Sequence, residues 1–169
     1  MTFVLGGAAS GKSQVAECMI INSGLSPIYL ATARVWDDEV DAKVILHRTR
    51  RGPEWHTIDA PIDVATPLGL ATSSQAVLLD CATMWLTNVI LAERDVAQAQ
   101  ADLLTALAAC AAPVVVVSNE VGQGIVPENA LARKFREAQG RLNIALAAQS
   151  DCTVHVVAGL ARTLKGTAP

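Results

Sequence analysis

A glycine-rich run near the amino end places the strongest constraint on how this chain can fold. Directly after the apolar residues Thr2–Leu5, the chain reads Gly6, Gly7, Ala8, Ala9, Ser10, Gly11, Lys12 and Ser13. This run fits G-x-x-x-x-G-K-[ST] at every fixed position, which is typical of a phosphate-binding loop between a strand and a helix. A glycine-rich turn that binds nothing would fit the same letters, but the strand before it and the helix after it favour the phosphate loop.

Such a loop works because phosphate oxygens need several N–H donors that converge on a small volume. Glycines allow both the backbone angles and the close approach that this requires. Lys12 would place its charge at the β and γ phosphates, and Ser13 would offer its hydroxyl to Mg²⁺. The helix that begins near Gly11 would point the positive end of its dipole at the anion.

The remaining sequence predicts the fold around this loop. Short β-branched or apolar runs alternate with longer helix-patterned stretches, which indicates an α/β fold with a mainly parallel sheet. Strands are expected at Thr2–Leu5, Pro27–Thr32, Trp55–Asp59, Ala76–Asp80, Pro113–Ser118, Cys152–Val157 and Leu160–Leu164. Val77–Leu79 and Val114–Val117 are apolar without alternation, as in central strands covered on both faces. The prediction is a P-loop NTPase fold of the RecA-like kind, a three-layer sandwich formed by residues 1–169 as one domain.

The composition excludes several other classes. The 169 residues carry a formal net charge of −3, whereas a dedicated nucleic-acid binder needs a broad basic face. The four cysteines are Cys18, Cys81, Cys110 and Cys152. They form no CxxC pair, so we expect core thiols in a reducing compartment and no zinc cluster. The longest apolar stretch, 106–117, is too short to span a bilayer, and we expect a cytoplasmic protein without a membrane span.

An acidic residue closes one of the apolar strands. Val77–Leu79 is followed by Asp80, and in P-loop proteins a carboxylate at the end of such a strand holds Mg²⁺. Taken alone, an aspartate in this place is more often a turn or cap residue. Beside a phosphate loop the metal role is favoured, so Ser13 and Asp80 are the predicted metal-binding residues.

Residues 37–51 predict a helix with acidic residues at its start and basic residues at its end. The basic end consists of His47, Arg48, Thr49, Arg50 and Arg51, followed by Gly52 and Pro53. Two interpretations stay open: the charges complement the helix dipole, or the arginines keep His47 neutral as a nucleophile and bind phosphate oxygens. His56 and His155 lie in predicted strands, where we expect packed or hydrogen-bonded side chains.

Two loops follow the carboxyl ends of predicted strands, where open parallel sheets bind ligands. They are Thr32–Arg34 and Asn119–Gly124, and the second combines an amide, a carboxylate and two glycines that could line a substrate pocket.

Residues 128–149 predict an amphipathic helix. Its apolar stripe is Leu131, Phe135, Ala138, Leu142 and Ala145, and its charged face, interpreted as solvated, is Arg133, Lys134, Arg136, Glu137 and Arg141. The tryptophans, Trp36, Trp55 and Trp85, are expected in the core or a pocket wall.

Together these motifs resemble the bifunctional adenosylcobinamide kinase and adenosylcobinamide-phosphate guanylyltransferase family of cobalamin biosynthesis. The resemblance covers nearly the whole chain. Besides the phosphate loop, it rests on Tyr29-Leu30-Ala31-Thr32-Ala33, Asp37-Asp38-Glu39, His47-Arg48-x-Arg50-Arg51, Trp55-x-Thr57, Leu79-Asp80-Cys81, Trp85-Leu86-Thr87-Asn88, Asn119-Glu120-Val121-Gly122-x-Gly124-Ile125-Val126-Pro127, Ala132-Arg133-x-Phe135-Arg136 and Gly140-Arg141-Leu142-Asn143.

The resemblance implies two reactions. In the first, a phosphoryl group passes from ATP or GTP to the hydroxyl of the aminopropanol arm of adenosylcobinamide. In the second, His47, which matches the family's guanylylated histidine, takes GMP from GTP and passes it to the phosphorylated corrinoid. Lys12 and His47 are then the catalytic residues, and Ser13 and Asp80 hold Mg²⁺. The implied nucleotide contacts are residues 6–13, Ala31, Thr32, Ala33, Arg48, Thr49, Arg50, Arg51, Asp59 and Asp80. The resemblance also implies a homotrimer.

Three positions depart from the family pattern, and two rival functions fit parts of the sequence. Ala9 stands where Arg is common, Ile144 where Gln is usual, and Asp59 where a glutamate with one more methylene is expected. One rival is a small-molecule kinase whose arginines only close over the transferred phosphoryl group. The other is a nucleotide-gated switch or assembly ATPase, for which long effector loops are expected. A covalent GMP adduct separates the first rival from the bifunctional enzyme.

Overall fold

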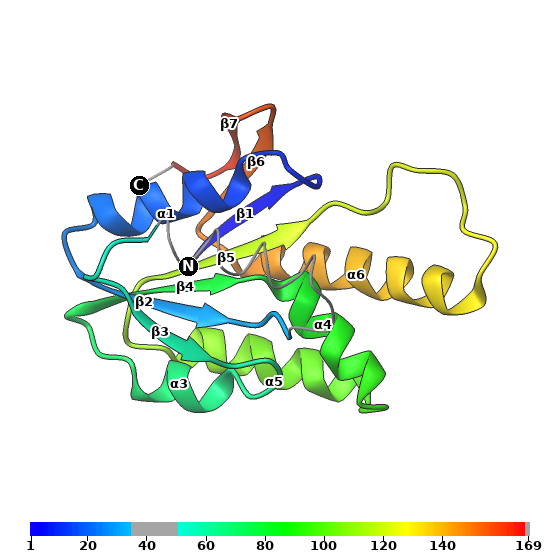
Figure 1. Cartoon of the computed structure of the whole chain (residues 1–169), viewed down its shortest axis with the longest axis horizontal. Helices are drawn as coiled ribbons and strands as arrows, with labels where there is room; N and C mark the ends of the chain where they lie inside the picture. Colours follow the sequence, from blue (N-terminus) through cyan, green and yellow to red (C-terminus); the bar gives the residue numbers. More distant parts are fainter. Residues whose placement is uncertain (35–50, 168–169) are drawn as a thin grey trace.

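The fold is an α/β arrangement built on one seven-stranded sheet (Figure 1). It is known from a computed structural model that describes residues 1–34 and 51–167. The strands are β1 (Thr2–Gly6), β2 (Ser26–Ala31), β3 (His56–Asp59), β4 (Gln75–Asp80), β5 (Val114–Asn119), β6 (Cys152–Val157) and β7 (Leu160–Lys165). The helices are α1 (Lys12–Asn22), α3 (Ala65–Leu70), α4 (Ala82–Leu91), α5 (Val96–Ala109) and α6 (Ala130–Gln149).

The strand order places the carboxyl ends of six strands along one edge of the sheet. The order is β3-β2-β4-β5-β1-β6-β7, and every pairing is parallel except that of β7 with β6. In register, Ala31 lies opposite both Asp59 and Asp80, and Gly6 lies opposite Asn119. The segments that follow these residues therefore meet at the edge where ligands of parallel sheets bind.

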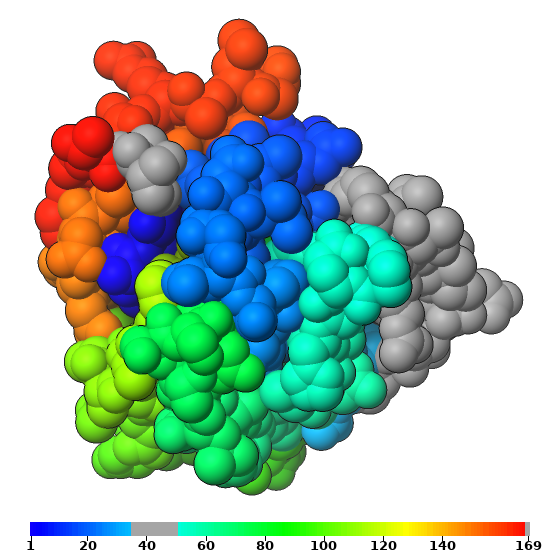
Figure 2. Space-filling model, turned by 90° about the vertical axis from the view of Figure 1, so that its left-hand side faces the viewer, coloured from blue at the N-terminus to red at the C-terminus, as the bar shows by residue number. Residues whose placement is uncertain are grey.

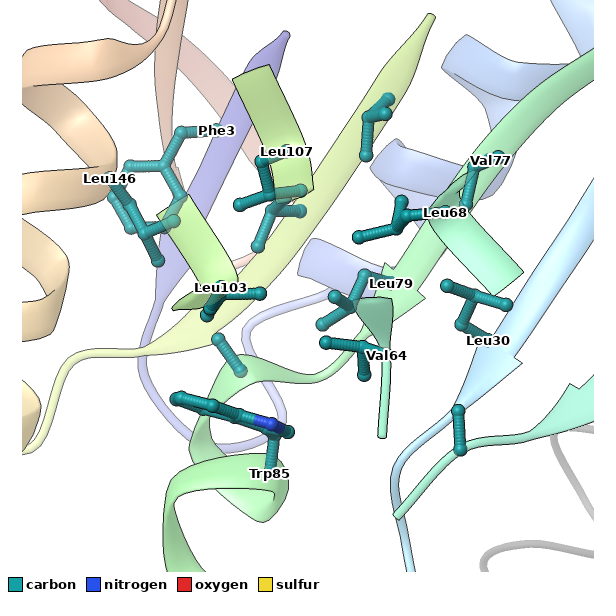
Figure 3. Close-up of a cluster of buried hydrophobic side chains, with 14 of the residues drawn as sticks. Phe3, Leu30, Val64, Leu68, Val77, Leu79, Trp85, Leu103, Leu107 and Leu146 are labelled. Atoms are coloured by element: carbon teal, nitrogen blue, oxygen red, sulfur yellow. The ribbon is translucent and has the colours of Figure 1, made fainter. Parts of the chain in front are cut away.

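Helices cover both faces of the sheet, as the three-layer prediction requires. Because strand side chains alternate in direction, Leu30 and Leu79 point to one face and Tyr29 and Leu78 to the other. The first face packs against α3, α4, α5 and α6, and Figure 3 shows part of this core. The second face packs against α1 through residues such as Ile20. The β6–β7 hairpin projects from the body in two views (Figures 1 and 2).

The predicted secondary structure is confirmed within the described residues. All seven expected strands are present with bounds within one residue of those predicted, and the helix expected over 128–149 spans 130–149. The helix expected over 37–51 lies outside the described residues, apart from Arg51. No helix in the described ranges is long and apolar enough to cross a membrane. That the chain forms one domain stays a prediction.

Three predictions about individual side chains are wrong. Cys18 is exposed because α1 turns Ala16 and Ile20 to the sheet, and position 18 lies about 200° around the helix from Ala16. His56 is exposed because it begins β3, which forms an edge of the sheet. Leu131 is 53% exposed because the first turn of α6 extends beyond the sheet (Figure 1).

Candidate functional site

The glycine-rich loop connects β1 to α1, as the motif predicts. Gly6 is buried, and a Cβ there would lie 2.5 Å from Ser10 Oγ and 2.6 Å from the backbone oxygen of Val156. Gly11 has a φ of +90°, a left-handed conformation that favours glycine. Of the three glycines in the loop, the two that the motif fixes, Gly6 and Gly11, are the two that cannot take a side chain without strain, since a Cβ on Gly7 would meet nothing within 4 Å.

The amino end of α1 is arranged to receive an anion. Gly11 is the N-cap residue, and because it has no side chain it leaves the first-turn N–H groups of α1 uncapped. Lys12 is 9% exposed, and its Nζ donates to the carbonyl oxygen of Gly7 at 3.1 Å across the loop. Ser13 lies in the same first turn. Free N–H groups, a positive dipole end and a lysine in one place fit the phosphates of a nucleotide.

A contact that the sequence did not predict supports this loop from the far end of the chain. The turn between β6 and β7, with Ala158 and Gly159 both at positive φ, approaches the loop. The Gly159 N–H donates to the Ser10 carbonyl oxygen at 2.8 Å, and a Cβ on Gly11 would lie 3.1 Å from Gly159 Cα. The close approach of these two glycines determines how the hairpin packs against the loop.

Asp80 ends β4 at the same edge of the sheet, and β5 separates β4 from β1. Its Oδ2 accepts a hydrogen bond from the Tyr29 hydroxyl at 3.2 Å. Burial, and secondly the Asp80 charge, raise the pKa of Tyr29 far above its usual value, so the hydroxyl stays a donor. Tyr29 is a site residue that the sequence analysis did not predict. The pairing of β2 with β4 places it opposite Leu78, two residues before Asp80.

Arg51 extends the basic segment to this edge. Its guanidinium carbon lies 3.3 Å from the centroid of the Tyr29 ring, a cation–π contact. Trp55 packs against the same ring edge-on, with 6.2 Å between ring centroids. The Nη1 of Arg51 is buried without a hydrogen-bond partner among the described residues. Such a donor fits an anion that the structure does not contain.

The loop 31–33 is joined to the residues that follow Asp80. Thr32 Oγ1 donates to the Cys81 carbonyl oxygen at 2.8 Å and accepts from the Cys81 N–H at 2.7 Å. Asn88 Nδ2 in α4 donates to the Thr32 carbonyl oxygen at 2.8 Å. Burial, with a smaller contribution from Asp80, raises the pKa of Cys81 to about 11, so its side chain stays a thiol.

Buried polar side chains of α6 hold the end of β5. Gln139 and Asn143 lie on the buried face of α6, where the predicted stripe contained only apolar residues. Ser118 Oγ donates to Asn143 Oδ1 at 2.7 Å and accepts from Gln139 Nε2 at 2.9 Å. Asn143 Nδ2 donates to the Asn119 carbonyl oxygen at 3.1 Å. Two amides spaced i,i+4 on an apolar stripe were the sequence signal for this network.

The charged face of α6 is exposed at Arg133, Lys134, Glu137 and Arg141, as its interpretation as a solvated surface predicts, but two of its arginines also bind the loop after β5. Arg136 donates to the carbonyl oxygens of Ile125 at 2.8 Å and Gly124 at 2.9 Å, and also to that of Gly122. Arg133 donates to the Pro127 carbonyl oxygen at 2.9 Å. These bonds fix the loop after β5, whose carbonyls would otherwise depend on water. Arg141, by contrast, pairs with Glu137 of the same helix, and not with the loop, among the described residues.

The structure brings most of the predicted site residues to one edge and leaves the others untested. Most of these residues follow or end strands at the carboxyl edge: Gly6, Gly7, Ala8, Ala9, Ser10, Gly11, Lys12, Ser13, Ala31, Thr32, Ala33, Asp59 and Asp80. Arg51 precedes β3 and joins them through its contact with the Tyr29 ring. Asp59 is exposed at the end of edge strand β3. His47, Arg48, Thr49 and Arg50 lie outside the described residues.

The described residues offer few donors for a metal ion. Within residues 1–34 and 51–167, no three His, Cys, Asp or Glu side chains gather where they could hold a metal ion. Ser13 and Asp80 offer a hydroxyl and a carboxylate, the oxygen donors that Mg²⁺ prefers. Mg²⁺ bound to nucleotide takes only one or two protein ligands and keeps waters and phosphates, so this small set fits it.

A separate cavity of about 470 Å³ opens between α3, α4 and α5, with Trp85, Arg94 and Asp102 in its lining. None of the predicted site residues lines it. The Trp85 Nε1 donates to the Ile62 carbonyl oxygen at 2.9 Å, so this tryptophan is both a core and a pocket-wall residue, as expected.

A phosphate loop between β1 and α1, with an aspartate ending β4 of a mainly parallel sheet, defines a P-loop nucleotide-binding protein. The chain belongs to the CobU family, cobinamide kinase / cobinamide phosphate guanyltransferase, whose model matches residues 2–164.

Two relatives agree with this assignment, and a solved structure agrees with the fold. The bifunctional adenosylcobalamin biosynthesis protein CobU of Salmonella typhimurium is 39% identical over 184 residues, covering 98% of this chain and 99% of the relative. CobP of Pseudomonas aeruginosa, with the same description, is 37% identical over 166 residues, covering 96% of each chain. A structure from Pyrococcus horikoshii OT3 has a TM-score of 0.57 at 8% identity, covering 98% of this chain and 86% of that one, which supports the fold alone.

Proposed function

We propose that this protein phosphorylates adenosylcobinamide with ATP or GTP and then transfers GMP from GTP, through His47, to give adenosylcobinamide-GDP. Membership of the cobinamide kinase / cobinamide phosphate guanyltransferase family supports both activities. The observation that carries the proposal is the meeting of three groups at one sheet edge. They are the Lys12 loop, the Asp80 carboxylate and the Arg51 guanidinium, which comes four residues after His47.

In the kinase step, the corrinoid hydroxyl oxygen bonds to the γ-phosphorus, the β–γ bridging P–O bond breaks so that ADP or GDP leaves, and the hydroxyl proton passes to solvent water. Lys12 and the N–H groups of residues 6–13 are proposed to hold the β and γ phosphates and their growing negative charge. Ser13 and Asp80 are proposed to hold Mg²⁺, which neutralises phosphate charge when bound.

In the guanylyl step, an imidazole nitrogen of His47 bonds to the α-phosphorus of GTP and pyrophosphate leaves. A phosphate oxygen of the corrinoid phosphate then displaces the histidine and forms the diphosphate. Arg48, Arg50 and Arg51 are proposed to bind phosphate oxygens, and Thr49, Asp59 and residues 31–33 to contact the nucleotide. The homotrimer stays a prediction from the family resemblance. The cytoplasmic location stays a prediction from the cysteine pattern and the short apolar stretch 106–117.

The test measures both reactions in His47→Asn. Label transfer from α-labelled GTP to the protein should disappear, while phosphorylation of adenosylcobinamide remains substantial. In the wild type the adduct should be labile in acid and stable in base, because its bond is P–N. His56→Asn is the matched control, since His56 is exposed on an edge strand and has no proposed role.

The outcomes separate the proposal from its rivals. Label on His47→Asn, or an acid-stable adduct, would exclude His47 as the nucleophile. A wild-type protein that phosphorylates the corrinoid but takes up no label would be a single-activity kinase. Nucleotide hydrolysis without phosphorylation of the corrinoid would favour the switch or assembly ATPase.

A further inference from the structure

We propose that Tyr29 is a positioning residue that joins Asp80 to Arg51, and so couples the metal-binding carboxylate to the basic segment after His47. The inference deepens the proposed function and rests on it, because it takes Asp80 as a Mg²⁺ ligand and Arg51 as an anion-binding residue. Tyr29 itself touches neither phosphate nor metal in this scheme.

The hydroxyl of Tyr29 contacts the carboxylate. Tyr29 lies in β2, directly beside β4, and its side chain is 6% exposed. Its hydroxyl donates to Asp80 Oδ2 at 3.2 Å, which occupies one oxygen of the carboxylate. A carboxylate at the end of a strand can rotate about its side-chain bonds. A hydrogen bond to one oxygen limits this rotation and would leave the other oxygen oriented to bind Mg²⁺.

The ring of Tyr29 positions the guanidinium. Arg51 lies over the ring at 3.3 Å, and Trp55 holds the ring edge-on. Stacking of this kind leaves the in-plane N–H donors of an arginine available for phosphate. Nη1 of Arg51 is buried and has no partner in the described part of the chain, which is the state expected of a donor positioned for an anion.

A purely structural role would not require these contacts. Tyr29 packs with Leu78 and Val117 in the core on the α1 side of the sheet, where a phenylalanine would fill the same space. The hydroxyl and the ring face can be removed separately. Tyr29→Phe deletes the bond to Asp80 and keeps the platform for Arg51, whereas Tyr29→Leu deletes both.

The experiment compares these two variants with Thr153→Val. Thr153 is 5% exposed at the amino end of β6, and its hydroxyl lies 2.7 Å from Ser150 Oγ, so the control loses a buried hydroxyl far from the site. For each protein we would measure thermal stability, the Mg²⁺ concentration that half-saturates the kinase, and the ratio of GMP labelling to kinase rate.

The expected results differ by variant. Tyr29→Phe should raise the half-saturating Mg²⁺ concentration by about tenfold, the equivalent of one net hydrogen bond, with the labelling ratio unchanged. Tyr29→Leu should also lower the ratio of labelling to kinase rate by about tenfold. Thr153→Val should change neither. Identical profiles for Tyr29→Phe and Thr153→Val, with an unchanged ratio in Tyr29→Leu, would overturn the proposal.

A readout without turnover uses the fact that Tyr29 is the only tyrosine in the chain. Protein labelled with 3-fluorotyrosine should give one ¹⁹F resonance, which should move in Asp80→Asn and in Arg51→Ala without any nucleotide. It should not move in Thr153→Val. A resonance that is indifferent to both site variants would refute the coupling. A wild type with neither kinase activity nor label, but with these shifts, would refute the proposed function instead.

Discussion

Replacing Gly6 by alanine tests whether the phosphate loop needs this glycine for space. The added Cβ would lie 2.6 Å from the Val156 backbone oxygen, about 0.8 Å inside the 3.4 Å at which ordinary contact begins. Ser10 Oγ, at 2.5 Å, can turn away, but Val156 lies in β6 directly opposite Gly6 in the register. The two strands would have to separate at the point where the loop begins.

Forcing a methyl group into packed structure typically costs about 1–3 kcal/mol. For a chain of this size, 1 kcal/mol lowers the melting temperature by roughly 2–4 °C. A cost of about 2 kcal/mol therefore predicts a fall of about 4–8 °C, measured by circular dichroism on protein without nucleotide. Nucleotide affinity should fall as well, because the loop that carries the N–H donors begins at the displaced residue.

Gly7→Ala is the matched control. A Cβ at Gly7 meets nothing within 4 Å, and its φ lies outside the left-handed region. Both variants restrict the unfolded chain by the same amount, about 0.4–1 kcal/mol in favour of folding, so the difference between them isolates the steric cost. If Gly6→Ala melts within about 1 °C of Gly7→Ala, the contact with Val156 does not explain why the motif fixes glycine there.

Three further predictions concern the loop, the thiols and α6. Lys12→Ala should lower GTP affinity, measured by calorimetry, and should lower kinase turnover by orders of magnitude, because the positive charge that contacts the β and γ phosphates is lost. Unchanged turnover would contradict the role of Lys12. At about pH 8 a thiol reagent should modify Cys18 in the native protein but Cys81 only after unfolding, because the pKa of about 11 leaves Cys81 protonated; mass spectrometry identifies the labelled residue. Arg136→Leu should speed amide hydrogen exchange in the loop after β5, whereas Arg141→Leu should not.

Features that depend on neighbouring residues could be predicted from the sequence. The strands are apolar runs bounded by turn residues, and their bounds follow within one residue. The phosphate loop is recognisable because its requirements are local. Gly11 must reach a φ of +90°, and Lys12 must follow it at the start of a helix. A motif of this kind reflects the backbone geometry of a few consecutive residues. It can therefore be recognised without knowing the order of the strands in the sheet.

Features that depend on strand order could not be predicted. Tyr29 and Asp80 are 51 residues apart, and Gly159 contacts Ser10 from the opposite end of the chain. Both contacts exist because β2 pairs with β4 and β1 pairs with β6. Neither pairing can be predicted from the residues near each strand in the sequence. The exposure of Cys18 had the same origin, since the side of α1 that faces the sheet decides it.

The register of β2 has a consequence for the departure at Asp59. Ala31 lies between Asp59 on β3 and Asp80 on β4, so both carboxylates are placed relative to the same backbone. Asp59 has one methylene fewer than the expected glutamate. The end of β3 cannot move outward to make up this length without losing its pairing with β2. A shift of the pairing by one residue would turn every side chain of β3 to the other face of the sheet. The reach of residue 59 is therefore set by its side chain alone. Tyr29 donates to Asp80 whatever residue stands at position 59, so a substitution at 59 should alter the proposed nucleotide contact and leave the proposed metal-binding carboxylate in place.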